Sequence, residues 1–183
     1  VENNGILYIW NEKNLKSREL EIKIRDELGV KQKIVNKMEI HDLEPNLKPI
    51  YSGGVFYDYA RHARNPKKIL IKLFENFLKK GGKFLKLNIQ DVNFDEGKPV
   101  LRSETQRFVF DKLVIACGAF SKKLTDILHE TIPLDTERGY HVHFKDLDHL
   151  ISRPVVNSNR GFGMSPMDQG LRVVGTVEFG GLE

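Results

Sequence analysis

The stretch from Leu113 to Ser121, which reads LVIACGAFS, limits the fold of this chain more than any other. Four apolar residues are followed by the small residue Cys117, by Gly118 and, from Ser121, by a segment with helical apolar spacing. This order predicts a buried strand that ends in a tight turn, then a helix that begins at a serine cap. Because Gly118 has no Cβ, a phosphate-bearing ligand can approach the backbone N–H groups of such a turn. Many α/β proteins contain this turn without using it, so the pattern alone leaves a purely structural role open.

The composition is that of a globular protein. Hydrophobic residues make up 40% and charged residues 30% of the 183 residues, which suits one domain with a core, or one domain and part of another. No apolar run approaches the roughly 20 residues that span a bilayer, and no signal peptide opens the chain. The net charge of +4 is spread along the sequence, so we expect no nucleic-acid partner.

The single cysteine, Cys117, excludes an internal disulfide framework and suits a reducing compartment. Because it ends the predicted buried strand, we expect it to be a small core residue. The sequence identifies no base or positive field that would activate its thiol, so we do not assign it as a nucleophile.

No complete dinucleotide fingerprint of the type GxGxxG occurs in the chain. Gly161 and Gly163 are followed by Pro166 where the third glycine belongs, and residues 175–181 lack the Lys-Ser/Thr pair of a phosphate-binding loop. Val1 is not a methionine, and strand-like residues begin almost at once. We therefore expect this chain to be a piece of a longer protein.

Alternation of apolar and polar residues between turn residues predicts strands. The expected strands are residues 5–10, 53–57, 83–94, 99–110, 132–144, 153–156, 160–165 and 171–179. Turn residues at 95–97, 157–159 and 168–170 separate consecutive strands, which is typical of an antiparallel sheet.

Two helices are predicted before residue 50. Leu20, Ile24 and Leu28 recur at helical spacing, although Leu20 and Ile24 also alternate with Ile22, which leaves a strand open there. Residues 36–39 read Asn-Lys-Met-Glu, the pattern of a capping box at the start of a short helix.

The clearest helix is predicted for residues 65–80. Asn65 is a favoured N-cap, Pro66 suits the first helical position, and two glycines after Lys80 end the helix. An apolar stripe on it is expected to be buried and consists of Leu70, Leu73, Phe74 and Phe77.

These predictions together indicate an α+β fold. Its main part is a mixed, largely antiparallel sheet with flanking helices, and residues 111–130 add one strand-turn-helix. We find no internal repeat and no low-complexity segment.

Three blocks in the second half of the chain carry a resemblance to a known family. They read VIACGAFS at 114–121, PLDTERGYH at 133–141 and MSPMDQGLRVVGTVEFGG at 164–181. In this order they closely resemble the FAD-dependent D-amino-acid dehydrogenases of the wider D-amino-acid oxidase superfamily. The resemblance implies a bacterial flavoprotein with FAD as its cofactor, and a dinucleotide fingerprint that lies before Val1.

The resemblance also implies a division of the chain. Residues 1–110 correspond to the first part of a substrate-binding domain, and residues 131–183 correspond to its second part. Residues 111–130 correspond to a strand-turn-helix of the FAD-binding domain. Since the main fingerprint is absent, we expect this piece alone to bind FAD weakly or not at all.

The implied reaction is the oxidation of a D-amino acid to the imino acid, which hydrolyses to a 2-oxo acid, by hydride transfer from Cα–H to the flavin. The resemblance further implies a respiratory electron acceptor, and hence a cytoplasmic protein with a peripheral contact at the inner face of a bacterial membrane. Two other functions stay open. One is oxidation of a sarcosine-like or proline-like secondary amine, and the other is a non-enzymatic binding module.

Cofactor contacts are expected at the turn of the first block. The resemblance implies that Ala116, Cys117, Gly118 and Ala119 approach the FAD through their backbone.

Substrate contacts are expected at His62, Arg64, Tyr140 and His141. His62 and Arg64 are either exposed loop residues or face the flavin, where a bidentate fork of Arg64 suits a carboxylate. The resemblance implies that Tyr140 and His141 line the substrate pocket. No residue is assigned as catalytic, because no strong base is needed if the amine is already neutral.

His141 and His143 stand two residues apart on a predicted strand and therefore share a face, a spacing that could serve a metal. A third ligand is not apparent, although Asp146, Asp148 and His149 follow. We therefore predict no metal site.

Overall fold

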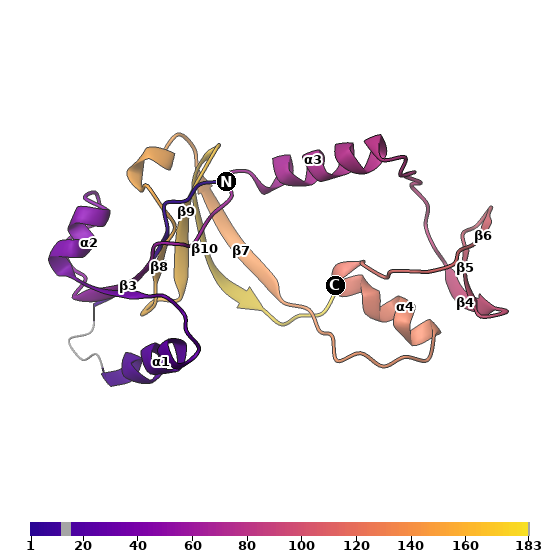
Figure 1. The fold of residues 1–183 in the computed structure, drawn as a ribbon, viewed down its shortest axis with the longest axis horizontal. Helices are drawn as coiled ribbons and strands as arrows, with labels where there is room; N and C mark the ends of the chain where they lie inside the picture. Colours follow the sequence, from indigo (N-terminus) through magenta and orange to yellow (C-terminus); the bar gives the residue numbers. More distant parts are fainter. Residues whose placement is uncertain (12–15, 183) are drawn as a thin grey trace. The chain divides into compact units, whose positions relative to one another are not determined.

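The computed structural model of this chain describes residues 1–11 and 16–182. These residues form two compact units (Figure 1), each built from separate parts of the chain. The first unit comprises Val1–Phe74 and Gly139–Val177, and the second comprises Glu75–Arg138 and the residues from Glu178 onward. None of the helices in the described ranges is long and apolar enough to cross a membrane.

The first unit is built on a seven-stranded sheet with the order β2-β3-β1-β8-β9-β10-β7. Its strands are β1 (Ile6–Trp10), β2 (Lys33–Asn36), β3 (Gly53–Tyr57), β7 (Arg138–Phe144), β8 (Val155–Asn157), β9 (Phe162–Met167) and β10 (Gly170–Glu178). β1 pairs parallel with β8, whereas the pairs β1–β3, β2–β3, β8–β9 and β9–β10 are antiparallel. The predicted α+β class with a mixed, largely antiparallel sheet is confirmed.

The core of the first unit lies on one face of this sheet. Leu7 and Ile9 of β1 are fully buried, and because strand residues alternate between the faces, both point to the same side. Helix α2 (Lys37–Leu43) covers that side through Ile40. The complete buried cluster is Leu7, Ile9, Val35, Ile40, Ile151, Val155 and Leu171. It therefore joins strands from both ends of the chain.

Helix α1 (Lys16–Glu27) lies against the opposite face of the sheet. Ile22 of this helix lines a small cavity together with Tyr8 and Val55, which are paired across β1 and β3. The helical interpretation of this segment is thus confirmed, and the alternative of a strand is wrong.

The second unit contains a three-stranded antiparallel sheet and a short helix. Strands β4 (Asp91–Asp95), β5 (Lys98–Arg102) and β6 (Arg107–Val109) pair in sequence order, with Val92 and Val100 buried. The 3₁₀ turn η1 (Gly118–Phe120) leads into α4 (Ser121–Ile127), which lies beside β4.

Local capping was predicted correctly at two helices. The Asn36 side chain accepts hydrogen bonds from the Met38 and Glu39 backbone N–H groups, and the Glu39 carboxylate accepts one from the Asn36 N–H. Helix α3 (Pro66–Lys79) begins as predicted, with the Asn65 side chain accepting from the Lys68 N–H at 3.1 Å.

The predicted buried strand before Gly118 is wrong. Residues 113–116 form no strand in the described chain, and Val114 is 84% exposed. A buried strand needs a neighbour that satisfies its backbone groups, and the three strands of the second unit pair only with one another. The apolar run therefore lies outside any sheet of the described residues, and Leu113 and Ile115 are half-buried beside a cavity.

The details of the following turn also differ from the prediction. Cys117 is exposed rather than a core residue, because the segment before it is not buried. Phe120 occupies the N-cap position of α4, and Ser121 is the first helical residue. The Ser121 hydroxyl accepts a hydrogen bond from the Cys117 N–H at 3.1 Å, so it ties the turn back onto itself.

The apolar stripe of α3 is not buried. Leu70 is 67% exposed, and the other three members of the stripe also count as exposed. Helical periodicity identified the apolar face correctly, but periodicity alone does not determine which surface packs against that face.

Several strands are shorter than predicted. Residues 83–90 are not in a strand, so only the end of the expected strand 83–94 forms β4. The expected strand 99–110 is divided into β5 and β6, because residues 103–106 form a turn. β7 begins at Arg138 rather than at residue 132.

Candidate functional site

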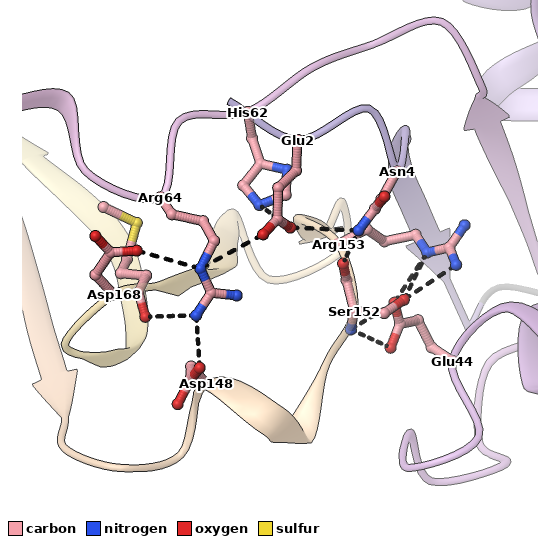
Figure 2. A network of polar contacts seen from close by, with 10 residues as sticks. Glu2, Asn4, Glu44, His62, Arg64, Asp148, Ser152, Arg153 and Asp168 are labelled. Atoms are coloured by element: carbon pink, nitrogen blue, oxygen red, sulfur yellow. Dashed lines mark hydrogen bonds and ion pairs between the residues drawn. The ribbon is translucent and has the colours of Figure 1, made fainter. Parts of the chain in front are cut away.

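Arg64 lies at the centre of a cluster of charged side chains in the first unit (Figure 2). Its guanidinium is 2.5 Å from Asp148, 3.4 Å from Asp168 and 3.6 Å from Glu2. It also donates to the Met167 carbonyl at 3.2 Å. Three segments that are far apart in sequence are therefore held together by one side chain.

Two carboxylates of this cluster, Asp148 and Asp168, are stabilised in their charged form. The hydrogen bond from Arg64 holds the pKa of Asp148 below its usual range. Asp168 accepts from Lys68 at 2.8 Å and from Asn65 at 3.4 Å, and chiefly the Lys68 bond lowers its pKa. In return, the Asp148 bond raises the pKa of Arg64. Arg64 is thus permanently charged and already paired.

His62 lies beside this cluster but is held differently. Its side chain is only 8% exposed, and its Nε2 lies 3.5 Å from a Glu2 carboxylate oxygen. Neither ring nitrogen makes a hydrogen bond to any residue that the structure describes. Burial is the main cause of a lowered pKa of His62, which the Glu2 charge opposes only in part. His62 is therefore a buried, neutral imidazole near pH 7.

A second ion pair in Figure 2 is largely buried. Glu44 is only 2% exposed and accepts from the Arg153 guanidinium at 2.9 Å and from the Ser152 hydroxyl at 2.6 Å. The Ser152 backbone N–H donates to both Glu44 carboxylate oxygens at 3.0 Å. This pair attaches the end of α2 to the segment that leads into β8.

His141 lies elsewhere on the sheet, on the edge strand β7. Its Nδ1 is 3.4 Å from an Nη of Arg172 on the neighbouring strand β10. Its ring packs edge-on against His143, with centroids 5.2 Å apart. The described residues include no group of three or more His, Cys, Asp or Glu side chains that could hold a metal.

The structure separates the four predicted substrate residues into different environments. His62 and Arg64 both contact Glu2, whereas His141 contacts Arg172. Tyr140 precedes His141 on β7 and therefore points to the opposite face of the sheet. Of these four residues only Arg64 lines the cavity of about 190 Å³ that His143 also lines.

One face of the sheet connects the Arg172 region with a group of tyrosines. In the strand registers Tyr8 pairs with Val156, Val156 with Gly163, and Gly163 with Val174, so all four residues share a face. Arg172 lies two residues before Val174 and shares that face too. We call this surface, which runs from Tyr8 to Arg172 opposite the core, the outer face.

At its β1–β3 end the outer face is hollowed. A cavity of about 230 Å³ is lined by Tyr8, Tyr57, Tyr59 and Arg25, among others. The Tyr8 and Tyr57 rings meet edge to face at 5.6 Å, and burial raises the pKa of Tyr57. No sequence motif indicates this group, because Tyr8 and Tyr57 come together only through the β1–β3 pairing.

The predicted cofactor turn lies in the second unit, at the mouth of a larger cavity of about 520 Å³. Cys117 and Phe120 line that cavity, whose other walls are mostly apolar residues of 87–92 and 113–115. Gly118 has a φ of +56°, and a Cβ placed there would meet no atom within 4 Å. The turn is therefore open to approach from outside.

Comparison with known proteins places this chain in a family. The family model described as FAD dependent oxidoreductase matches residues 1–183. The chain belongs to this family.

One curated relative of this FAD dependent oxidoreductase is a D-amino-acid oxidase from Bradyrhizobium diazoefficiens. The two are 31% identical over 184 residues, which is 100% of this chain and 44% of the relative. Glycine oxidase from Geobacillus kaustophilus has the same fold, with a TM-score of 0.84, 16% identity, and coverage of 100% of this chain and 50% of the other. L-proline dehydrogenase from P. horikoshii also has this fold, with a TM-score of 0.83, 14% identity, and coverage of 100% of this chain and 51% of the other. The chain thus spans about half the length of the proteins it matches.

The turn residues of this FAD dependent oxidoreductase can contact a cofactor through their backbone. The first N–H groups of a helical turn have no partner within that turn, which applies here to Gly118 and Ala119. The Cys117 N–H, by contrast, is already bonded to Ser121. The neighbouring apolar cavity is within the roughly 300–1,000 Å³ of ligand pockets. If FAD binds here, the backbone of residues 116–119 would border it, chiefly through Gly118 and Ala119.

Sequence reasoning missed the partners of Arg64 and Arg172. No motif signalled Glu2, Asp148 or Asp168, which reach Arg64 only through the fold. Arg172 was visible only as one residue of the third sequence block. Its position next to His141 depends on the pairing of β7 with β10.

Proposed function

We propose that this chain provides the substrate-binding part of an FAD-dependent oxidoreductase that oxidises the Cα–N bond of an amino acid. The observation that carries the proposal is the outer face of the sheet, where His141 and Arg172 adjoin exposed surface and a tyrosine-lined cavity lies further along. Membership of the FAD dependent oxidoreductase family supports the redox chemistry.

In this proposal, bound FAD supplies the chemistry by accepting the hydride that leaves the substrate Cα. The protein binds the substrate, orients its Cα–H and excludes water. His141 and the tyrosines provide polar and aromatic surface for the substrate. His62 and Arg64 border the site without direct contact, since both are engaged with Glu2. Tyr140 contributes from the other side of its strand.

We propose a D-amino acid as the substrate. The support is the D-amino-acid oxidase from Bradyrhizobium diazoefficiens, which is 31% identical over the whole of this chain. The imino acid formed would hydrolyse to a 2-oxo acid and ammonia. A respiratory acceptor, a cytoplasmic location and a peripheral contact with the inner membrane remain part of this proposal through the sequence resemblance alone.

A secondary amine is the second candidate. The L-proline dehydrogenase from P. horikoshii and the iminodiacetate oxidase from Chelativorans sp. share the fold, with TM-scores of 0.83 and 0.78. Both names describe a substrate whose nitrogen carries two carbon substituents. A binding module without redox activity is less favoured, because the family match covers the whole chain.

The division of labour within the chain is also proposed. Residues 1–110 and 131–183 would serve the substrate side, and residues 111–130 would join the FAD-binding part. The exposed apolar run around Val114 supports the second assignment, since an unpaired extended segment is suited to pair with a further strand.

The test measures reduction of bound flavin in the FAD-loaded protein that contains this chain. D-amino acids and N-methyl amino acids are supplied in turn without oxygen, and loss of flavin absorbance is followed. We expect rapid bleaching with one or more D-amino acids. Activity confined to N-methyl substrates would favour the second candidate, and a protein that holds no flavin would support the binding module.

A further inference from the structure

Two groups of side chains lie at opposite ends of the outer face. His141 and Arg172 lie at the β7–β10 end, and the cavity of about 230 Å³ lies at the β1–β3 end. We propose that this cavity, which we call the tyrosine hollow, holds an uncharged aromatic ring at the far end of the substrate. The substrate is then an amino acid with a long substituent that ends in such a ring. That the ring belongs to a substrate rests on the proposed function.

Three tyrosine rings form the tyrosine hollow. The Tyr57 ring meets the Tyr8 ring at 5.6 Å with the planes at 82°, and it meets the Tyr59 ring at 6.4 Å with the planes at 90°. Aromatic rings prefer this arrangement, because the positive edge of one ring then faces the negative face of the other. Tyr8 is 37% and Tyr59 is 54% exposed, so both flanking rings keep surface that a further ring can contact in the same way. The hollow therefore offers a place for a fourth ring.

The size of the tyrosine hollow suits a single ring. Its volume of about 230 Å³ is below the roughly 300–1,000 Å³ of pockets that hold drug-sized ligands. Ile6 and Ala60, which also line it, carry no charge. One ring at the end of a connecting chain fits this space, whereas a molecule of several rings does not.

Positive charge at the hollow disfavours a cationic ligand group. Arg25 lines the hollow, and together with Arg18 it also lines a neighbouring cavity of about 80 Å³. The two guanidinium groups lie 3.5 Å and 3.4 Å from the same carboxylate oxygen of Glu21. Glu21 is the only carboxylate among the described residues that line the two cavities. The excess positive charge repels an ammonium group and attracts the face of a neutral aromatic ring.

The position of the hollow in the sheet determines how long the substituent must be. β10 and β1 are three steps apart in the sheet order, and neighbouring strands lie about 4.8 Å apart. The strand registers place Tyr8 of β1 level with Val174 of β10. The β1 side of the hollow therefore lies about 14 Å across the sheet from β10. No side chain of a common amino acid spans this distance, so a substrate that contacts both ends needs a longer substituent.

The first test measures ring binding to the 183-residue chain through the fluorescence of Trp10, the only tryptophan in the sequence. Trp10 lines the neighbouring cavity together with Tyr8, and calorimetry of the same titration measures binding directly. We expect p-cresol to bind saturably. 4-Methylcyclohexanol has a similar size but no aromatic ring and should bind about 2- to 10-fold more weakly. Benzylamine, which adds a positive charge to the ring, should also bind more weakly.

Two variants locate the bound ring. Tyr59→Leu removes an exposed flanking ring and should weaken p-cresol binding about 2- to 10-fold. Phe94→Leu removes an exposed ring of the second unit and should bind p-cresol like the parent chain. Absence of saturable p-cresol binding to the parent chain, or unchanged affinity in a folded Tyr59→Leu variant, would overturn the proposal.

The second test uses the FAD-loaded protein that contains this chain and two derivatives of D-lysine. Nε-benzoyl-D-lysine carries an uncharged ring at the end of a long substituent, and Nε-acetyl-D-lysine has the same arm without the ring. We expect the benzoyl derivative to reduce the flavin with a kcat/KM about 2- to 10-fold higher, and Tyr59→Leu to remove this preference.

The outcomes distinguish this inference from the proposed function. If p-cresol binds through Tyr59 but the FAD-loaded protein oxidises no amino acid or amine, the ring site stands and the enzymatic function is wrong. If D-amino acids are oxidised and the benzoyl group brings no preference, the function stands and this inference is wrong.

Discussion

Two arginines of the same unit have opposite surroundings. Arg64 is enclosed by Glu2, Asp148 and Asp168, whereas the His141 ring is the only polar side chain of the described residues that contacts Arg172. Both residues are charged at any physiological pH, so the difference lies in what compensates the charge. An arginine with internal carboxylates stabilises the fold.

The comparison also changes the interpretation of the sequence. The sequence pattern predicts Arg64 as a substrate contact because it lies in a polar loop before a helix, and it does not distinguish Arg172 within its strand. The carboxylates around Arg64 favour a structural role for it instead. The following predictions test the two kinds of arginine environment, from the largest expected effect to the smallest.

Among the arginine–carboxylate pairs compared here, we expect the largely buried pair of Glu44 and Arg153 to contribute most to the free energy of unfolding. Glu44→Gln leaves the Arg153 charge without its partner in a buried position, so we expect the free energy of unfolding to fall by about 3 kcal/mol. Urea denaturation measures it. Glu27→Gln breaks an exposed pair with Lys23 as the matched control and should cost less than about 1 kcal/mol. Equal effects of the two substitutions would contradict the interpretation of Glu44.

Arg64→Met should lower the free energy of unfolding by about 1–2 kcal/mol, because three carboxylates lose a shared partner. Urea denaturation of the parent chain and the variant measures the change. The interpretation of Arg64 as a structural residue fails if this variant keeps its stability.

His62 should make the free energy of unfolding depend on pH, and we expect this effect to be smaller than those of the two substitutions above. Its pKa is lowered in the folded protein by burial, so the unfolded chain binds more protons just below the ordinary histidine pKa. The contribution to stability is complete above pH about 6.5 and is lost as the pH falls towards the folded pKa. Asp148 and Asp168, whose pKa values are also lowered, lose their contribution only at more acidic pH.

Urea unfolding at pH 7.5 and pH 5.5 measures this dependence. We expect lower stability at pH 5.5 in the parent chain and a smaller difference in His62→Gln. An unchanged difference in the variant would mean that other groups cause the pH dependence.

Much of the local structure could be predicted from the sequence. The capping box at Asn36 and the cap at Asn65 were read from residue type and spacing, because both depend only on groups within one helical turn. The strands around residues 5–10 and 53–57 were predicted for a similar reason, since alternation and turn residues are local signals.

Predictions that required a packing partner were the ones that failed. The stripe on α3 and the run at 113–116 are apolar, yet Leu70 and Val114 are exposed. Apolar residues at regular spacing define a face that can be buried, but burial needs a surface opposite that face. The same limit applies to Cys117, which was expected in the core only because of its neighbours.

The sequence by itself determined the family, the helix caps and most strand positions, because these depend on short-range order and on motifs. Only the tertiary structure decided which carboxylates surround Arg64 and that no carboxylate of the described residues pairs with Arg172. The contacts of Arg64 join residues up to 104 positions apart in the sequence. Electrostatic compensation falls off with distance in space, not in sequence, so the environment of a charge becomes known only when the chain is folded.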